Sequence, residues 1–69
     1  MESLKAMDVH DRLKYIRESR GLTLAEVAAG IGVTAQAVHR YENTDVLPSL
    51  DVMRRIAIFY KMDPKKLFF

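Results

Sequence analysis

The sequence predicts an all-α fold made of five short helices. Three observations lead to this prediction: apolar residues recur at helical spacing along nearly the whole chain, the period-two alternation of strands is absent, and capping residues divide the sequence into short segments. No internal repeat and no stretch rich in Gly, Ser or Pro separates one part of the chain from another. We therefore expect an N-terminal arm over residues 1–7 and one helical domain over residues 8–69.

The first helix is expected to start near Asp8, whose carboxylate can accept hydrogen bonds from free backbone N–H groups. Val9, Leu13 and Ile16 follow at spacings i, i+4 and i+7, which is typical of a buried helical stripe. Gly21 suits the position just after a helix, where a positive φ is needed. The first helix should therefore end before Gly21.

The second helix has the clearest start signal in the chain. Thr23 and Glu26 form a capping box, in which the Thr hydroxyl and the Glu carboxylate each accept from the other residue's backbone N–H. Gly30 lies in the last turn and should weaken the helix by about 1 kcal/mol relative to Ala. The residues expected to face inward are Val27, Ala28 and Ile31.

The third helix follows a turn at Gly32 and is capped by Thr34. Its inward positions are Val38 and Tyr41. The positions expected to face outward are Ala35, Gln36, Ala37, His39, Arg40 and Asn43.

Two more helices complete the fold. A loop over residues 43–48 leads to a fourth helix, which is capped by Ser49 and runs to Tyr60. Asp63 and Pro64 open a short fifth helix, because Asp is a good N-cap and Pro at the first helical position loses no helical hydrogen bond.

The composition excludes several kinds of protein. The 69 residues include no cysteine, which removes disulfides and thiol nucleophiles, and two histidines are too few to indicate a metal site. No apolar run approaches the roughly 18 residues of a membrane span, and no signal peptide is evident, so we expect a cytoplasmic protein without cofactor or metal. No catalytic constellation occurs at usable spacing, so an enzyme is not expected. The net charge of +2 permits an anionic partner without requiring one.

The pair of helices around Gly32 is the informative feature for function. A helix of about two turns, a short turn and a second capped helix have the spacing of a helix-turn-helix unit, in which the first helix braces the second against a duplex. The major groove admits one helix, and exposed amides at helix N-termini bind phosphate. The spacing alone is weak evidence, since any helical hairpin can imitate it.

A longer string of residues at defined intervals runs through the whole chain. It consists of Arg12-Leu13, Ile16-Arg17, Gly21-Leu22-Thr23, Glu26-Val27-Ala28, Gly32-Val33-Thr34, Val38, Arg40-Tyr41-Glu42-Asn43, Pro48-Ser49-Leu50, Ile56-Ala57, Asp63-Pro64 and Leu67-Phe68. With this string the chain resembles the Cro/cI-type helix-turn-helix family, the lambda-repressor-like DNA-binding domains. The resemblance implies a five-helix domain that binds operator DNA, usually as a homodimer. It also implies an internal ion pair between Arg17 and Glu42.

The resemblance further implies which residues contact DNA. Gln36 and Arg40 fall where the family reads bases, and both suit this role because Gln pairs with adenine and Arg with guanine in bidentate fashion. Thr34 and Asn43 fall where the family contacts phosphate at the two ends of the recognition helix. His39 lies on the same side, where it either contacts DNA or is a solvated surface histidine.

The chain departs from the family pattern at three places. Leu24 stands where the family usually has a phosphate-binding Gln, Ala35 stands at the first base-reading position, and the loop over residues 44–47 lacks the usual Gly and basic residues. Either Ala35 packs against a thymine methyl with Leu24 behind it, which we favour, or this patch does not face DNA. Thr23, at the start of the second helix, completes the expected DNA contacts together with Ala35.

Apolar residues near the loop and the C-terminus exceed what five short helices can bury: Val46, Leu47, Phe59, Phe68 and Phe69. In relatives the loop before the fourth helix and the C-terminal helix supply the dimer contact, which places two recognition helices about 34 Å apart, one turn of DNA. The alternative is that Phe59 and Phe68 are core residues. We adopt this alternative for Phe68 and expect Leu47 to be exposed.

We therefore expect a sequence-specific transcriptional regulator, a repressor, that binds double-stranded DNA as a homodimer. It should carry a basic face across Arg40, Arg12 and the N-terminal ends of the second to fourth helices. The alternative is a protein-interaction module of the same fold, an antitoxin or anti-repressor type, with weak or lost DNA readout and a regulatory protein partner. Leu24, Ala35 and the acidic, apolar loop motivate this alternative.

Overall fold

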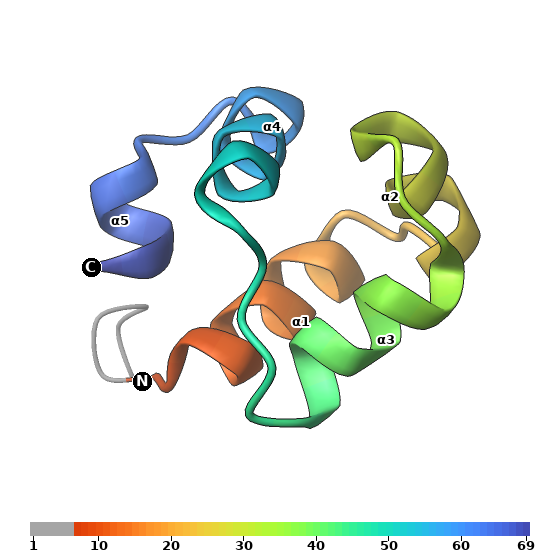
Figure 1. The fold of residues 1–69 in the computed structure, drawn as a ribbon, viewed down its shortest axis with the longest axis horizontal. Helices are drawn as coiled ribbons and strands as arrows, with labels where there is room; N and C mark the ends of the chain where they lie inside the picture. The colour runs from red at the N-terminus through yellow and green to blue at the C-terminus, as the bar shows by residue number, and fades with distance from the viewer. Residues whose placement is uncertain (1–6) are drawn as a thin grey trace.

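The computed structural model describes residues 7–69 and confirms the all-α prediction. Figure 1 shows its five helices, which are α1 (Val9–Ser19), α2 (Leu24–Ile31), α3 (Ala35–Asn43), α4 (Leu50–Tyr60) and α5 (Pro64–Phe68). Of the arm expected over residues 1–7, all but Met7 lies outside the described residues. Within the described part of the chain, no helix is long and apolar enough to span a membrane.

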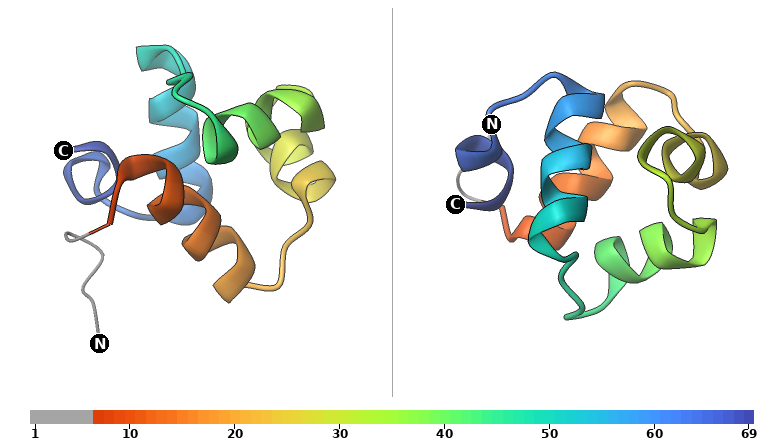
Figure 2. Two further views of the ribbon diagram at one scale, coloured as in Figure 1. Left: turned by 90° about the horizontal axis from the view of Figure 1, so that it is seen from below. Right: turned by 45° about the horizontal axis from the view of Figure 1, so that its top comes forward.

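The core lies where the five helices meet. α2 and α3 pack against each other, α1 packs against α3 and α5, and α4 packs against α2 and α5, as Figures 1 and 2 show. Every helix contributes to the buried apolar set, which consists of Leu13, Ile16, Val27, Ala28, Ile31, Val38, Ile56, Ala57, Tyr60 and Leu67. The inward positions expected for α2 are therefore confirmed.

The capping box of α2 is formed as predicted. The Glu26 backbone N–H donates to Thr23 Oγ1 at 3.0 Å, and the Thr23 backbone N–H donates to Glu26 Oε1 at 2.9 Å. The hydrogen bond from the Thr23 backbone lowers the pKa of the Glu26 carboxyl, because it favours the charged form. The box therefore contributes stability above the ordinary pKa of a glutamate and loses it as the pH falls through the lowered pKa.

The other N-caps agree with the sequence except at α1. The side chains of Thr34, Ser49 and Asp63 each accept from a backbone N–H in the first turn of α3, α4 and α5. Asp8 occupies the N-cap position of α1, but its carboxylate makes no capping hydrogen bond, so that part of the prediction is wrong. The side chain is exposed, where water already solvates a carboxylate, and it lines a surface hollow together with Asp11.

Two glycines make the turns that the sequence predicts, with φ of 68° at Gly21 and 74° at Gly32. After α1, the Gly21 N–H donates to the Glu18 carbonyl at 3.0 Å and the Leu22 N–H donates to the Arg17 carbonyl at 3.1 Å. This pair of bonds is a Schellman motif, which satisfies carbonyls at the helix end. The second turn ends α2 and leads directly to α3, so it sets the angle between these two helices.

Gly30 has a packing role that its position in the sequence does not reveal. A Cβ at this residue would lie 2.2 Å from Cε1 and 2.5 Å from Cδ1 of the Phe59 ring. The ring is half-buried and packs against the core, so Phe59 is not part of an exposed partner surface. α2 thus accepts a glycine in its last turn because α4 places an aromatic ring directly against it.

We expect Gly30→Ala to destabilise the domain by about 1–3 kcal/mol, because the added methyl overpacks the contact with Phe59. Helix propensity alone would give the opposite sign, a gain of about 1 kcal/mol. Urea unfolding followed by circular dichroism measures the difference. The double variant Gly30→Ala/Phe59→Leu relieves the clash, so it should recover part of the loss. A single variant more stable than the parent would show that the ring does not block this position.

Candidate nucleic-acid interface

The residues expected to contact DNA lie on the exposed side of α3 and at the starts of α2 and α3. Gln36 and Arg40 are both exposed and are separated by one helical turn. The other exposed members of the expected set are Thr23, Thr34, Ala35, His39 and Asn43. Ala37, which we placed on the same face, is half-buried instead.

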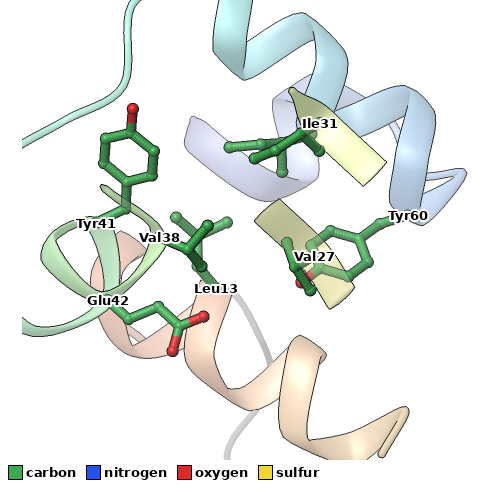
Figure 3. A pocket seen from close by; sticks show the side chains of 8 residues that line it. Leu13, Val27, Ile31, Val38, Tyr41, Glu42 and Tyr60 are labelled. Carbon is green, nitrogen blue, oxygen red and sulfur yellow. The ribbon is translucent and has the colours of Figure 1, made fainter. Parts of the chain in front are cut away.

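The opposite side of α3 is fixed to the core. Val38 is buried, Tyr41 is half-buried, and the Glu42 side chain is only 2% exposed. Figure 3 shows these three residues around a cavity that they share with side chains of α1, α2 and α4. The cavity measures about 10 Å³, at most the space of a single water molecule, so it is a packing gap and not a ligand site.

The expected ion pair between Arg17 of α1 and Glu42 of α3 is formed. Arg17 Nε lies 2.8 Å from Oε2 and 3.1 Å from Oε1 of Glu42, and Nη2 lies 3.0 Å from Oε1. Arg17 Nη1 also donates to the Leu22 carbonyl at 2.8 Å, which ties the chain before α2 to the same guanidinium. The hydrogen bond with Glu42 raises the pKa of Arg17. One buried contact therefore sets the position of α3 relative to α1 and the approach to α2.

A phenol lies beside this pair at the same cavity. Burial raises the pKa of Tyr60 to about 12, and the Glu42 carboxylate adds to the rise because it disfavours a second negative charge. Tyr60 therefore stays neutral at physiological pH. The Arg20 guanidinium lies 5.2 Å from the centre of the Tyr60 ring, in cation–π contact.

Polar side chains at the C-terminal end of α3 hydrogen-bond to backbone carbonyls of the same helix. Asn43 Nδ2 donates to the His39 carbonyl at 2.9 Å, and Thr44 Oγ1 donates to the Arg40 carbonyl at 2.7 Å. These bonds satisfy carbonyls of the last turn. They engage one N–H of the Asn43 amide and leave the second N–H for the phosphate contact that we expect from this residue.

The charge around α3 differs from one end to the other. A hollow of about 250 Å³ adjoins Asn43 and Thr44, and its lining includes the carboxylates of Asp8, Asp11 and Asp45. These charges repel phosphate. Phosphate contacts are thus favoured toward the N-terminal ends of α2 and α3, where open amides carry partial positive charge.

Arg12 does not belong to the exposed basic face, contrary to our prediction. The residue is only 7% exposed. Its Nη1 donates to the Leu67 carbonyl and its Nη2 donates to the Met7 carbonyl, both at 2.6 Å. The long side chain of Arg12 lies inside the domain because two backbone carbonyls from the ends of the described chain replace the water that a guanidinium otherwise needs.

Leu24 and Ala35, the two residues of the helix-turn-helix that depart from the family pattern, have different surroundings. Leu24 is half-buried and packs against the core, whereas Ala35 is exposed. A leucine here closes the edge of the core instead of offering a polar group to a phosphate. Ala35, which the resemblance places at the first base-reading position, therefore presents only a methyl group.

The exposed apolar residues are partly those that the sequence predicts. Val46, Leu47 and Phe69 are 48%, 53% and 86% exposed, while Phe68 is half-buried against the core as expected. Three further exposed residues were missed, namely Tyr15 on α1 at 51%, and Leu50 and Ile58 on α4 at 74% and 70%. The spacing of eight residues between Leu50 and Ile58 was a signal that could have placed them on one outward stripe of α4.

The sequence of this chain is similar to those of known helix-turn-helix proteins. Residues 13–67 match the sequence model of a family described as helix-turn-helix. An HTH-type transcriptional regulatory protein of Pyrococcus abyssi (strain GE5 / Orsay) is 40% identical over 45 residues, which are 65% of this chain. The chain matches only 14% of the Pyrococcus protein's length, so the similarity concerns a small part of that protein.

Among the described residues, no group of three His, Cys, Asp or Glu side chains is placed to hold a metal ion.

Proposed function

The chain belongs to the helix-turn-helix family, and from this premise we propose that it is a sequence-specific DNA-binding transcriptional regulator that inserts α3 into the major groove. One observation carries the proposal. Gln36 and Arg40 point outward together, while Val38 and Glu42 of the same helix anchor it to the core. A rigid helix with long hydrogen-bonding side chains on its free side is what base readout requires.

Each exposed residue has a role that follows from its chemistry. The Gln36 amide both donates and accepts, which matches adenine, and the Arg40 guanidinium has two parallel donors, which match guanine. Thr23 and Thr34 cap α2 and α3, so phosphate can meet their hydroxyls and the open amides beside them. His39 and Asn43 extend the contact toward the end of α3.

We propose that the regulator acts as a homodimer and represses by occupying its operator. Val46, Leu47 and Phe69 leave apolar surface in water that a second copy can cover. An isologous contact gives a two-fold axis, and the two copies of α3 then meet successive major grooves about 34 Å apart. Occupation of such a site blocks other proteins from the same DNA.

A protein-interaction module of the same fold is the second candidate. The burial of Leu24 and the acidic hollow beside Asn43 favour it, because both reduce the affinity for phosphate. A stoichiometric protein partner, found together with DNA affinity that does not change in Arg40→Ala, would support this candidate over the first.

Selection of binding sites from random duplexes, followed by footprinting, tests the proposal. We expect a two-fold symmetric sequence with half-sites about one helical turn apart and an affinity that falls steeply as salt rises. Failure to enrich any sequence at low salt, while circular dichroism shows an intact fold, would rule out the regulator.

We expect Gln36→Ala to relax base preference at one operator position by about 1–3 kcal/mol. Gln36 is exposed and the structure records no hydrogen bond from its side chain to the described part of the chain, so the thermal midpoint should not change. Competition binding with the four bases at that position measures the preference. Full retention of the parent's preference would place Gln36 outside the base-reading set.

A further inference from the structure

The outward side of α4 combines exposed apolar side chains with one arginine. Leu50, Arg54 and Ile58 are all exposed and follow one another at intervals of four residues, so they lie on one side of the helix over about 12 Å. Leu50 and Ile58 are among the large apolar residues that the fold leaves most exposed. We call these three residues the α4 face.

The contacts that hold the domain together do not use the α4 face. α4 packs against α2 and α5 (Figure 1), and its buried residues are Ile56, Ala57 and Tyr60. None of the residues expected to contact DNA belongs to α4, and the α4 face lies outside the apolar residues that we assign to the homodimer contact. The α4 face is therefore not part of any site described above.

Arg54 supplies the charge of the α4 face. At the edge of the face, Arg55 Nη2 lies 2.8 Å from Asp51 Oδ2, so these two neighbours neutralise each other. The structure records no ion pair and no hydrogen bond of the Arg54 side chain with the described part of the chain. The α4 face thus presents one cation between two apolar side chains.

The charge of Arg54 argues against a second copy of this chain on the α4 face. In an isologous contact, a residue at the two-fold axis meets its own counterpart. Arg54 lies midway between Leu50 and Ile58, so a contact centred on the face would bring two guanidinium groups together, and like charges repel across an interface. The surface that complements the face has a carboxylate between two apolar groups.

We propose that the α4 face binds a helix of another protein, in which an aspartate or glutamate lies between two apolar residues. Apolar residues four positions before and after the carboxylate share its side of the helix, which is the spacing of Leu50 and Ile58 around Arg54. The contact removes the apolar side chains of both partners from water, and the carboxylate pairs with the Arg54 guanidinium. The inference goes beyond the proposed function, because it adds a protein-binding surface on a helix that DNA binding does not use.

Two synthetic peptides of about 16 residues, long enough to form a helix, test the inference. One carries Leu, Glu and Leu at intervals of four in a sequence of alanine and glutamine, and the other has Lys in place of Glu. Fluorescence anisotropy measures the affinity of each peptide for the protein. We expect the Glu peptide to bind about tenfold more tightly than the Lys peptide, which brings a second cation to Arg54. Arg54→Glu should reverse this preference.

Two further variants locate the contact. Lys66→Glu is the matched control, because it makes the same charge change at an exposed position of α5 outside the α4 face, and it should keep the preference for the Glu peptide. Ile58→Ala should weaken binding of the Glu peptide about tenfold, the effect of removing one apolar side chain from the contact.

Equal binding of the two peptides by the parent, no binding of either peptide, or a preference that persists in Arg54→Glu overturns the inference. Sedimentation equilibrium without DNA supplies a further test. A dimer that Ile58→Ala dissociates would show that a second copy covers the α4 face, which also overturns the inference. Selection of DNA sites reports on the proposed function separately, so either proposal can fail without the other.

Discussion

Replacement of Glu42 by alanine is expected to lower the free energy of unfolding by about 3–5 kcal/mol, because it leaves the Arg17 guanidinium without its partner in the interior. The side chains of Arg17 and Glu42 are 12% and 2% exposed, so water cannot readily replace the lost carboxylate. A domain of 69 residues has little stability to spare, and the variant should be largely unfolded at room temperature.

Urea unfolding of the parent and three variants isolates this effect. Glu42→Gln keeps the shape and some hydrogen bonding, so it should lose less than Glu42→Ala and stay folded for measurement. Asp51→Ala is the matched control, because it breaks the 2.8 Å pair with Arg55 on the surface of α4, where both side chains are more than half exposed. That loss should be below about 1 kcal/mol. Equal midpoints for Glu42→Ala and the parent would show that the pair does not stabilise the fold.

Leu67→Ala should destabilise the domain by about 2–5 kcal/mol, because the Leu67 side chain is completely buried and its removal leaves a cavity. Leu67 is also the residue whose carbonyl accepts from Arg12. Loss of the side chain therefore loosens α5 at the point where the buried guanidinium holds it, and the short helix has no other fully buried residue.

Thermal unfolding measures this loss. Leu67→Met preserves volume and should cost less than about 1.5 kcal/mol. Lys66→Ala, at an exposed neighbouring position, should have almost no effect. A loss for Leu67→Ala no greater than that for Lys66→Ala would mean that α5 is not part of the cooperative fold.

Local signals made most of the fold predictable. The capping box at Thr23, the cap at Thr34 and the glycines after α1 and α2 act within a few residues, so the sequence alone locates the helix ends. The helical spacing of apolar residues likewise predicted which side of α2 faces the core. Helix caps, turn glycines and helical periodicity depend on the backbone N–H groups, the backbone dihedral angles and the helical repeat, which are the same in every protein chain.

Contacts between distant residues were not predictable in the same way. The ring of Phe59 against Gly30 and the bonds from Arg12 to Leu67 join residues far apart in the chain. From the sequence alone, Gly30 is expected to weaken its helix and Arg12 is expected to lie on the surface. The tertiary structure shows instead that Gly30 makes room for the Phe59 ring and that Arg12 is buried. The expectation for Arg12 was wrong for this reason.

The outward placement of Gln36 and Arg40 was predictable from the sequence, and the charge around α3 was not. The helical period placed Gln36 and Arg40 together on the outside of α3, and the structure has both exposed. The acidic hollow combines Asp8 and Asp11, at the start of α1, with Asp45 in the loop between α3 and α4. It therefore exists only when α1 and α3 are packed together. Which of the exposed residues contact DNA stays a prediction.

The affinity of Arg40→Ala for the selected operator is the most direct test of groove insertion by α3. We expect affinity to fall by roughly ten- to a hundredfold, the loss of one bidentate contact with guanine, while the thermal midpoint stays that of the parent. Lys61→Ala, which removes an exposed cation beyond the end of α4, should change affinity much less. Arg40→Ala that binds the operator as tightly as the parent, with the same base preference, would contradict the account.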